Sequence, residues 1–494
     1  MIQVYVNLIV KTYFHGFEHS ISKITEPICY LINRRLTMAQ SDSPSMDMCS
    51  GPLGKKILLF SIPLMFSNVL QVLFNLSDVA VVGHFAGAIA LGSVGSTTTL
   101  VTLFTGLMLG IASGVNAITA RFLGAMNPKK VEKAVHTSFI LCLTLGILLL
   151  LFGLLFTKPV LLLLHTKKEL IDGAVLYLTI YLCGSPALAM FNYGNAILSA
   201  NGDTKRPLTY LTISGIINVI LNLIFVINFH MGVAGVALAS IIAQYISAIL
   251  VLRHLTQIKS VIRLQFRQIR LDRRICSQIL HIGIPSAMQY SLFAIANLFV
   301  QSAVNTFNHV VVEGNSAAAN ADSLIFDMMS AFYTACTSFI AQNYGAGHKK
   351  NILRIYGITS LYSFGLGLFL GLLLVALRTP FLSMFNADPE ILYYGSVRLT
   401  IMGFSYCLSA FMDNATAAAR GIGKSIVPTF IVISGSVILR IVWIFTIFAW
   451  FHTLKSLYLL YSCSWIITAA AGNIYFWRCY KKLPEENFIP KVHI

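Results

Sequence analysis

The sequence predicts an all-α integral membrane protein with twelve transmembrane helices in two six-helix lobes. Two observations lead to this prediction. About a dozen apolar runs have roughly the 20 residues that cross a hydrocarbon core about 30 Å thick, and the second six runs repeat the first six. The chain is 56% hydrophobic and only 11% charged, and a soluble domain carries about twice that share of charge. The composition therefore excludes an ordinary soluble protein.

The apolar runs define the expected spans and domains. The spans are expected near residues 57–82, 92–118, 134–157, 171–199, 208–229, 232–254, 276–301, 316–341, 353–377, 391–418, 428–450 and 456–478. The predicted domains are an N-terminal extension 1–50, an N-lobe 51–255, a basic cytoplasmic linker 256–274, a C-lobe 275–482 and a cytoplasmic tail 483–494. The extension holds no spanning run, so Met38 and Met46 are alternative starts and the first 37 residues are expected to be dispensable.

Residues that recur about 221 positions apart reveal the repeat. The pairs are Pro63 with Pro285, Gly124 with Gly345, Gly202 with Gly423 and Pro207 with Pro428. Because each unit contains an even number of spans, both units run in the same direction and are related by an axis along the membrane normal. Such a pair predicts a central cleft that opens to alternate sides as the lobes rock, which is how a secondary transporter works.

The net charge of +17 fits a membrane protein better than a nucleic-acid-binding protein. The basic residues lie in short loops, with about 28 Lys and Arg on one side of the predicted membrane and about five on the other. The positive-inside rule places both termini in the cytoplasm. We expect a multi-pass membrane protein that acts as a monomer and does not bind nucleic acid.

Polar residues share one face of the first span. Asn68, Gln71, Asn75 and Asp78 follow one another at steps of three or four residues. A carboxylate in the bilayer costs roughly 2.5 to 3.5 kcal/mol on insertion scales, so Asp78 must face protein or water. A buried carboxyl group that changes between charged and neutral forms suits a proton carrier. The alternative is a structural carboxylate bonded to neighbouring amides.

The remaining polar residues of the spans differ between the lobes. In the first lobe, Asn218 and Asn222 share a face of the fifth span, and the fourth span carries Tyr177, Asn192 and Asn195. Amides in membrane helices often serve only to hold helices together. In the second lobe the acids are Asp322, Asp327 and Asp413, and the buried bases are Arg398 and Arg440. Asp413 either pairs with Arg440 as a structural unit or takes part in transport.

Nothing in the chain indicates catalysis, a resident cofactor or a metal site. The string GIGKS at 421–425 resembles the end of a phosphate-binding loop, but Ala418 stands where the first glycine of that loop belongs. The histidines form no metal-binding pair of known spacing. We therefore predict a transporter rather than an enzyme.

Several segments closely resemble the multidrug and toxic compound extrusion (MATE) family, in particular its bacterial DinF- and MepA-like members. They are GPLGKKILLFSIPLMFSNVLQVLFNLSDVAVVGHF, ARFLGAMNPKKVEKAV, ILSANGDTKRPL, FIAQNYGAGHKK and AARGIGKSIVP. The resemblance implies a V-shaped pair of six-helix bundles that expels cationic or amphipathic toxic compounds in exchange for inward H⁺ or Na⁺. It covers the chain from about Gly51 to Lys482.

The resemblance also assigns roles to residues. It implies that Asp78 is the acid for cation coupling and that Asp413 matches a tenth-span acid of the NorM branch. Asn222 stands where the family often has Asp, and the seventh span lacks the acid of the NorM branch. Both departures weaken a Na⁺ site, so we favour H⁺ as the coupling ion.

These inferences give one set of candidate residues, in which Ser240 is included because the resemblance implies that it lines the cavity of the first lobe. Predicted coupling residues are Asp78, Asn218, Asn222, Ser240 and Asp413, and predicted residues of the substrate cleft are Asn68, Gln71, Asn75, Tyr177, Asn192, Asn195, Asp322 and Asp327. The main rival function is a flippase for lipid-linked oligosaccharides from the same superfamily. Such a protein lines its cleft with basic residues, whereas the buried bases here are Arg398 and Arg440.

Overall fold

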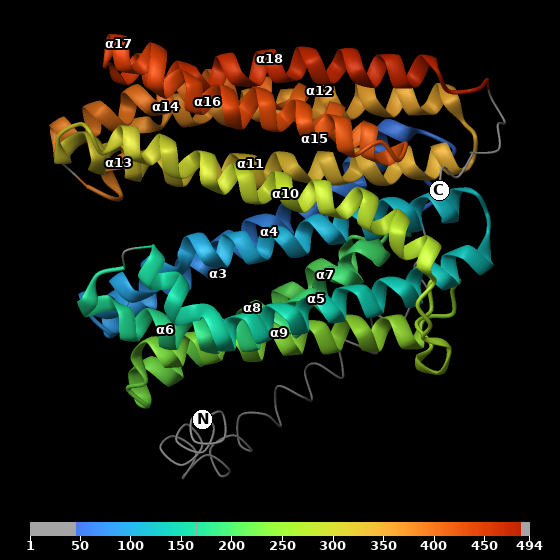
Figure 1. Ribbon diagram of the computed structural model, residues 1–494, viewed down its shortest axis with the longest axis horizontal. Coiled ribbons are helices and arrows are strands. Elements are labelled where there is room, and N and C mark those ends of the chain that lie inside the picture. Colours follow the sequence, from blue (N-terminus) through green and yellow to red (C-terminus); the bar gives the residue numbers. More distant parts are fainter. Residues whose placement is uncertain (1–45, 165, 387, 486–494) are drawn as a thin grey trace. The chain divides into compact units, whose positions relative to one another are not determined.

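The computed structural model describes residues 46–164, 166–386 and 388–485, and it shows these residues as helices joined by short loops (Figure 1). We refer to Leu53–Gln257 as the N-lobe and to Arg273–Lys481 as the C-lobe. In Figure 1 the N-lobe helices, coloured blue to green, lie together, and the C-lobe helices, coloured yellow to red, form the other half.

The N-lobe contains the first six spans. Its helices are α3 (Leu53–Phe85), α4 (Ala88–Gly124), α5 (Pro128–Leu163), α6 (Lys168–Cys183), α7 (Ser185–Ala200), α8 (Lys205–Leu223) with the π-helical turn η1 (Ile224–Asn228), and α9 (Gly232–Gln257). A short 3₁₀ turn, η2 (Phe266–Gln268), lies in the linker between the lobes.

The C-lobe repeats this order. Its helices are α10 (Arg273–Val304), α11 (His309–Gly345), α12 (Lys349–Ala376), α13 (Arg378–Ser383), α14 (Pro389–Gly421), α15 (Ile426–Val432), η3 (Ile433–Ile438), α16 (Leu439–Trp443), η4 (Ile444–Phe448), α17 (Ala449–Phe451) and α18 (Leu454–Lys481). Segments α15 to α17 run in series and form the eleventh span.

The twelve-span, all-α prediction is confirmed, although two spans depart from simple apolar helices. Ten helical segments of the described chain are long and apolar enough to cross a membrane. The fourth span is broken, since α6 and α7 meet at an angle of 46°. The tenth, α14, is 33 residues long but more polar, and it packs against α11, α12 and α18. Its polar side chains are tolerated because neighbouring helices surround them.

The repeated glycines occupy equivalent places in the two lobes. Gly202 and Gly423 both follow a helix with positive φ, at 87° and 83°, which glycine adopts without strain. A Cβ on Gly124 would lie 1.9 Å from the carbonyl oxygen of Gln342, and one on Gly345 would lie 2.0 Å from that of Arg121. The absence of side chains at both positions lets α4 and α11 cross with their backbones in contact.

The lobes meet along α4 and α10, and also along α3 and α11. Three glycines at four-residue spacing on α4 make the first contact close. A Cβ on Gly110 would lie 2.3 Å from the backbone nitrogen of Ala287, and one on Gly114 would lie 2.4 Å from the carbonyl oxygen of Ile279. The third, Gly106, faces the Cβ of Tyr290. No larger residue fits at Gly110 or Gly114 unless the helices separate.

Hydrogen bonds between the lobes gather toward one end of these helices. The Ser338 hydroxyl donates to Asn116 Oδ1 over 2.9 Å, and Gln342 Nε2 donates to the carbonyl oxygen of Ala200 over 2.7 Å. Near the middle of α3, Asn68 Nδ2 donates to the carbonyl oxygen of Asp327 over 2.7 Å. The described hydrogen bonds between the lobes thus join them from the helix centres to the end that carries the α4–α5 turn.

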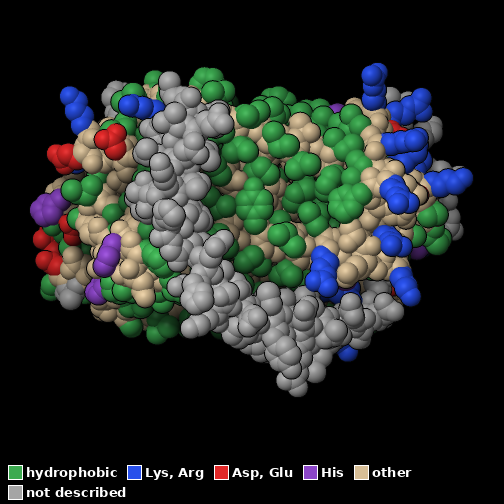
Figure 2. All heavy atoms as spheres, turned by 90° about the horizontal axis from the view of Figure 1, so that it is seen from below, with side chains coloured by type: hydrophobic (Ala, Val, Ile, Leu, Met, Phe, Trp, Pro, Cys, Tyr) green, Lys and Arg blue, Asp and Glu red, His purple; other side chains and the backbone are tan. Residues whose placement is uncertain are grey.

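Lys and Arg side chains gather at one end of the face in Figure 2, with an apolar belt between that end and the other, where Asp, Glu and His are also seen. Such a belt flanked by polar ends is the surface expected of a membrane protein.

Most of the predicted extension, together with the end of the tail, lies outside the described residues. Residues 46–50 are described, and they contact both lobes. Met46 lies against Gly202 of the N-lobe, and the fully buried Met48 accepts at its carbonyl oxygen a hydrogen bond from Asn343 Nδ2 of the C-lobe over 2.9 Å. The prediction about the first 37 residues lies wholly outside the described part.

Candidate functional site

Asp78 lies in α3 at the centre of a polar cluster inside the N-lobe. Asn222 Nδ2 donates to its Oδ1 over 2.5 Å, and the Ser240 hydroxyl donates to its Oδ2 over 3.0 Å. Asn218 completes the cluster, since its Nδ2 donates to the Ser240 hydroxyl over 3.4 Å. Asn218, Asn222 and Ser240 are buried. The structure therefore brings four of the five predicted coupling residues together, from helices α3, α8 and α9.

A close helix contact positions this cluster. One turn before Asp78, the ring of Phe74 lies so near α8 that a Cβ on Gly215 would be 1.8 Å from a ring carbon. Residues three and seven positions after Gly215 lie on the same helix face, and these are Asn218 and Asn222. The glycine thus allows α3 to approach α8 and sets both amides against the carboxylate.

A π-helical turn follows the cluster directly. Segment η1 begins at Ile224, two residues after Asn222, and turns of this kind are frequent at functional sites. The Oδ1 atom of Asn222 is buried and has no hydrogen-bond partner among the described residues. An unused buried acceptor is costly, so this oxygen is available to a proton donor or a cation beside Asp78.

The other predicted N-lobe residues lie around or away from the cluster. Tyr177 is buried and stacks on Tyr181, with ring centroids 5.9 Å apart. Asn192 Nδ2 donates to the carbonyl oxygen of Leu188, and Asn195 Oδ1 accepts from Ser199, so both amides are bonded within α7. In their described hydrogen bonds these two amides hold their own helix and do not reach Asp78.

The stripe on α3 separates into parts with different surroundings. Asp78 enters the polar cluster, whereas Asn68 bonds across the lobe contact to α11, where its Nδ2 also lies 2.9 Å from the Ser330 hydroxyl. Gln71 and Asn75 are exposed. One helical face therefore serves the N-lobe interior, the lobe contact and the surface.

The C-lobe contains a different kind of polar network. Arg398 Nη2 lies 2.5 Å from Asp322 Oδ2, and the same guanidinium donates to Asn315 Oδ1. Tyr406 donates its hydroxyl proton to the other oxygen of Asp322, and the Tyr458 hydroxyl donates to Asn315 over 3.1 Å. Asp322 is thus neutralised by an arginine and held by a tyrosine.

Arg440 does not form the ion pair with Asp413 that the sequence offered as one alternative. Arg440 is 3% exposed and lies over the ring of Tyr461, at 4.6 Å from the centroid, and its closest described acceptors are Ser464 and Asn297 at 3.5 Å. The π-helical turns η3 and η4 flank this arginine on the eleventh span. Because they change the rotation of the helix, α-helical spacing does not predict which way the Arg440 side chain points.

Asp413 and Asp327 lie apart from the Arg398 network. Asp413 lies beside the Tyr333 hydroxyl, with Arg420 and Arg440 within electrostatic range. Arg420 itself donates to Gln289 Oε1 over 2.6 Å. Asp327 is partly buried, and in its described hydrogen bonds its backbone carbonyl, not its carboxylate, accepts from Asn68.

Sequence reasoning missed several members of these networks. The Arg398–Asp322 ion pair is held by Asn315, Tyr406 and Tyr458. The one sequence signal for this network was Asn315, a polar residue in an apolar span. Among the described residues, no group of three or more His, Cys, Asp and Glu side chains is placed to hold a metal ion.

Two six-helix lobes meet along glycine-lined helices, and one lobe holds a carboxylate among neutral amide and hydroxyl groups. These features are typical of a multi-pass membrane transporter. A sequence model of the MatE family matches residues 63–224 and 285–446, once in each lobe. The chain therefore belongs to the MatE family, and it is a transporter rather than an enzyme.

Known relatives agree with this assignment. The chain is 27% identical over 361 residues to a Bacillus subtilis protein named "Probable multidrug resistance protein YpnP", covering 73% of this chain and 80% of that one. It is 23% identical over 385 residues to "Probable multidrug resistance protein NorM" of Thermotoga maritima, covering 77% and 82%. A solved structure of an outward-facing multidrug resistance MATE family transporter matches with a TM-score of 0.84 at 22% identity, covering 90% of this chain and 99% of that chain.

Proposed function

We propose that the protein is a proton-coupled antiporter that expels cationic or amphipathic toxic compounds across the bacterial inner membrane, with both termini in the cytoplasm and no bound cofactor. The main support for proton coupling is the environment of Asp78. Its carboxylate accepts hydrogen bonds from Asn222 and Ser240, and among the described residues no arginine or lysine forms an ion pair with it. A carboxylate held only by neutral donors changes the charge of its site when it takes up a proton.

Protonation changes the packing as well as the charge. The hydrogen bonds from Asn222 and Ser240 are strong because the acceptor is ionised. A proton on Asp78 weakens both bonds and turns one carboxyl oxygen into a donor, for which Asn222 Oδ1 is the nearby unused acceptor. The contact of α3 with α8 and α9 is then free to rearrange, and the charge that attracts a cationic compound is lost.

The lobe contacts support alternating access. The hydrogen bonds that join the lobes lie from the helix centres to the end of the α4–α5 turn, and positive-inside orientation makes that end cytoplasmic. The state described here is then closed to the cytoplasm. Opening on that side requires Ser338 and Asn116 to separate, together with Gln342 and Ala200.

The substrate class rests on the relatives, two of which are named as multidrug resistance proteins. Compounds that are cationic and amphipathic suit a site whose N-lobe charge is a single acid. The C-lobe acid Asp322 is neutralised by Arg398 and therefore contributes little to attracting a cation.

Transport by purified protein in proteoliposomes tests the proposal. Ethidium is a suitable fluorescent cation, with a pH gradient and a Na⁺ gradient applied in separate experiments. We expect the pH gradient to drive ethidium movement and the Na⁺ gradient to have no effect at constant pH. Movement driven by Na⁺ alone would assign the coupling to Na⁺, and no ethidium movement under either gradient would overturn the proposed substrate class.

A further inference from the structure

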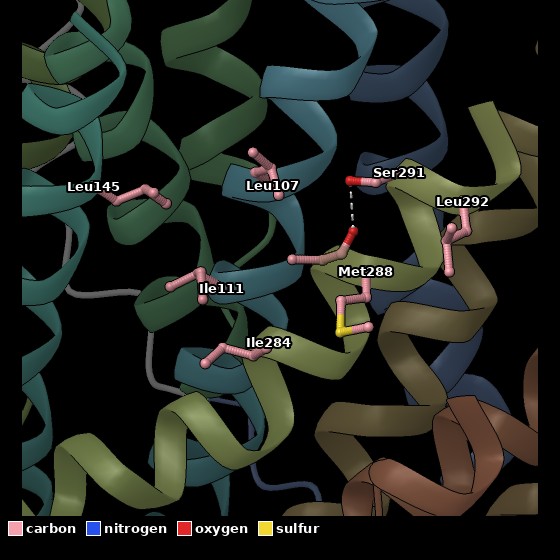
Figure 3. A pocket seen from close by; sticks show the side chains of 8 residues that line it. Leu107, Ile111, Leu145, Ile284, Met288, Ser291 and Leu292 are labelled. Carbon is pink, nitrogen blue, oxygen red and sulfur yellow. Dashed lines mark hydrogen bonds between the residues drawn. The ribbon is translucent and has the colours of Figure 1, made fainter. Parts of the chain in front are cut away.

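An apolar groove of about 370 Å³ lies where α4 and α5 of the N-lobe face α10 of the C-lobe (Figure 3). The side chains that line it include Leu107, Ile111, Leu145, Ile284, Met288 and Leu292. The groove is formed by residues of both lobes, and it is separate from the polar clusters around Asp78 and Asp322.

The groove offers no free polar group. Its one hydroxyl, on Ser291, donates to the carbonyl oxygen of Ala287 over 3.1 Å, as Figure 3 shows. Ile284 and Met288 are 48% and 47% exposed, so the groove is open at the surface of the apolar belt. An occupant must therefore be a hydrocarbon that arrives from the bilayer.

Basic side chains stand on α10 beyond one end of the groove, at the start of the helix. On α10, Arg274, His281 and Met288 follow one another at steps of seven residues and lie on nearly the same helix face. At 1.5 Å per residue, Arg274 is about 21 Å from Met288 along the helix. Arg273 and Arg274 are both exposed at the start of α10. A polar, positively charged end thus continues into an apolar groove on one helix.

The two helices that border the groove are tied together at this basic end. Lys133 Nζ of α5 lies 3.1 Å from Oδ2 of Asp272. Asp272 caps α10 and accepts hydrogen bonds from the backbone N–H groups of Arg274 and Ile275. The Ile275 N–H and the Lys133 side chain hold the pKa of Asp272 below its usual value, so it stays charged at neutral pH. The ion pair links α5 to the start of α10 beyond the groove.

We propose that this groove binds an acyl chain of an anionic phospholipid whose headgroup lies at Arg273 and Arg274. The hydrocarbon layer of one leaflet is about 15 Å thick. This length fits an acyl chain that starts near His281 and reaches Met288 and Leu292. Basic pockets between membrane helices bind anionic headgroups, and each nearby Lys or Arg adds to the attraction. The basic side chains suit an anionic headgroup and the apolar groove suits an acyl chain, and an anionic phospholipid has both.

The site has a mechanical consequence because it spans the lobe contact. A ligand that binds one arrangement of the lobes stabilises that arrangement. The bound chain would fill the space between α5 and α10 and favour the arrangement described here over one in which these helices approach. The phospholipid is thereby a regulator of lobe movement and not a substrate.

Lipid retention by the purified full-length protein tests this site without reference to the coupling ion. The probes are dioleoyl phosphatidylglycerol and dioleoyl phosphatidylcholine, added in detergent and counted per protein by native mass spectrometry. We expect one phosphatidylglycerol to be retained in preference to phosphatidylcholine. Equal retention of the two lipids would overturn the proposal.

Two variants with matched controls locate the site. Met288→Trp fills the groove and should remove the retained lipid, whereas Ile295→Trp, on an exposed position of α10 outside the groove, should keep it. Arg274→Ala should reduce the preference for phosphatidylglycerol about fivefold, the effect of one basic residue near a charged lipid, and Arg267→Ala in the linker should not.

The remaining outcomes also decide the matter. Wild-type retention by Met288→Trp, or equal loss in Ile295→Trp, would overturn the groove as the binding site. Loss of ethidium efflux in Met288→Trp with unchanged lipid retention would instead make the groove a drug path. If Met288→Trp does not fold, Leu145→Phe narrows the groove from α5, and normal lipid retention by that variant would count against the proposal.

Discussion

The two lobes share a backbone plan but hold Asp78 and Asp322, one acid from each lobe, in opposite ways. In the N-lobe, Asp78 is bonded by the neutral groups of Asn222 and Ser240. In the C-lobe, Asp322 is bonded by the positively charged Arg398 and by Tyr406. Asp78 is therefore a single negative charge among neutral donors, whereas the charges of Asp322 and Arg398 cancel within an ion pair.

This difference shows that the two repeats share their helix contacts but not the charged residues inside them. Gly202 and Gly423 keep the same left-handed turn, and Gly124 and Gly345 keep the same close crossing. The residues about 221 positions from Asp78 and Arg398 are Phe299 and Tyr177. A proton-binding role is therefore expected at Asp78 and a structural role at the Asp322–Arg398 pair.

Replacing the N-lobe acid should have the largest effect on transport. We expect Asp78→Asn to fold, insert and bind drug, but to reduce efflux driven by a pH gradient to the level of empty liposomes, because an amide cannot carry a proton. Asp78→Glu, which keeps a carboxyl group, should retain part of the activity. Wild-type rates for reconstituted Asp78→Asn would end the proton-coupling role.

Breaking the C-lobe ion pair should have the largest effect on stability. Arg398→Met leaves the Asp322 carboxylate buried without its cation, and removal of one partner of a buried pair costs about 3–5 kcal/mol. We expect a clearly lower thermal unfolding temperature in detergent. The double variant Asp322→Leu with Arg398→Met should recover part of that loss, and a single variant as stable as the wild type would refute the neutralised-pair interpretation.

Disturbing the lobe contact should cost less. Gly110→Ala places a methyl group 2.3 Å from the backbone of Ala287, and overpacking of this kind costs typically about 1–3 kcal/mol. Gly357→Ala in α12 is the matched control, since a Cβ there meets no atom within 4 Å and alanine favours a helix. Equal thermal stabilities for the two variants would show that the α4–α10 contact yields easily.

The smallest effect on transport is expected at Asp413. Arg420 and Arg440 lie within electrostatic range of it, and the seventh span supplies no carboxylate partner. Asp413→Asn should lower ethidium efflux or shift substrate preference while keeping some pH-driven activity, measured in the same proteoliposomes. A silent variant would remove Asp413 from the coupling residues, and a complete loss with an active Asp78→Asn would reverse the roles of the lobes.

The order of the spans and the face of Asp78 were predictable because they depend on local pattern. Apolar length marks a span whatever it packs against, and three- or four-residue spacing marks a helix face. The same spacing did not show that Asn68 and Asp78 have different partners, because the two residues lie on one helix face. Their positions along α3 decide that Asn68 meets α11 and Asp78 meets α8.

The sequence by itself determined the all-α membrane class, the two repeats and the acid most apt to titrate, because hydropathy and periodicity are properties of each segment alone. Tertiary structure decided the partners: Asn222 meets Asp78 across 144 residues of chain, and Arg398 meets Asp322 across 76. Such pairings depend on how each helix is rotated and how closely glycines let it approach its neighbours. The π-helical turns beside Asn222 and Arg440 change that rotation in a way that helical spacing does not encode.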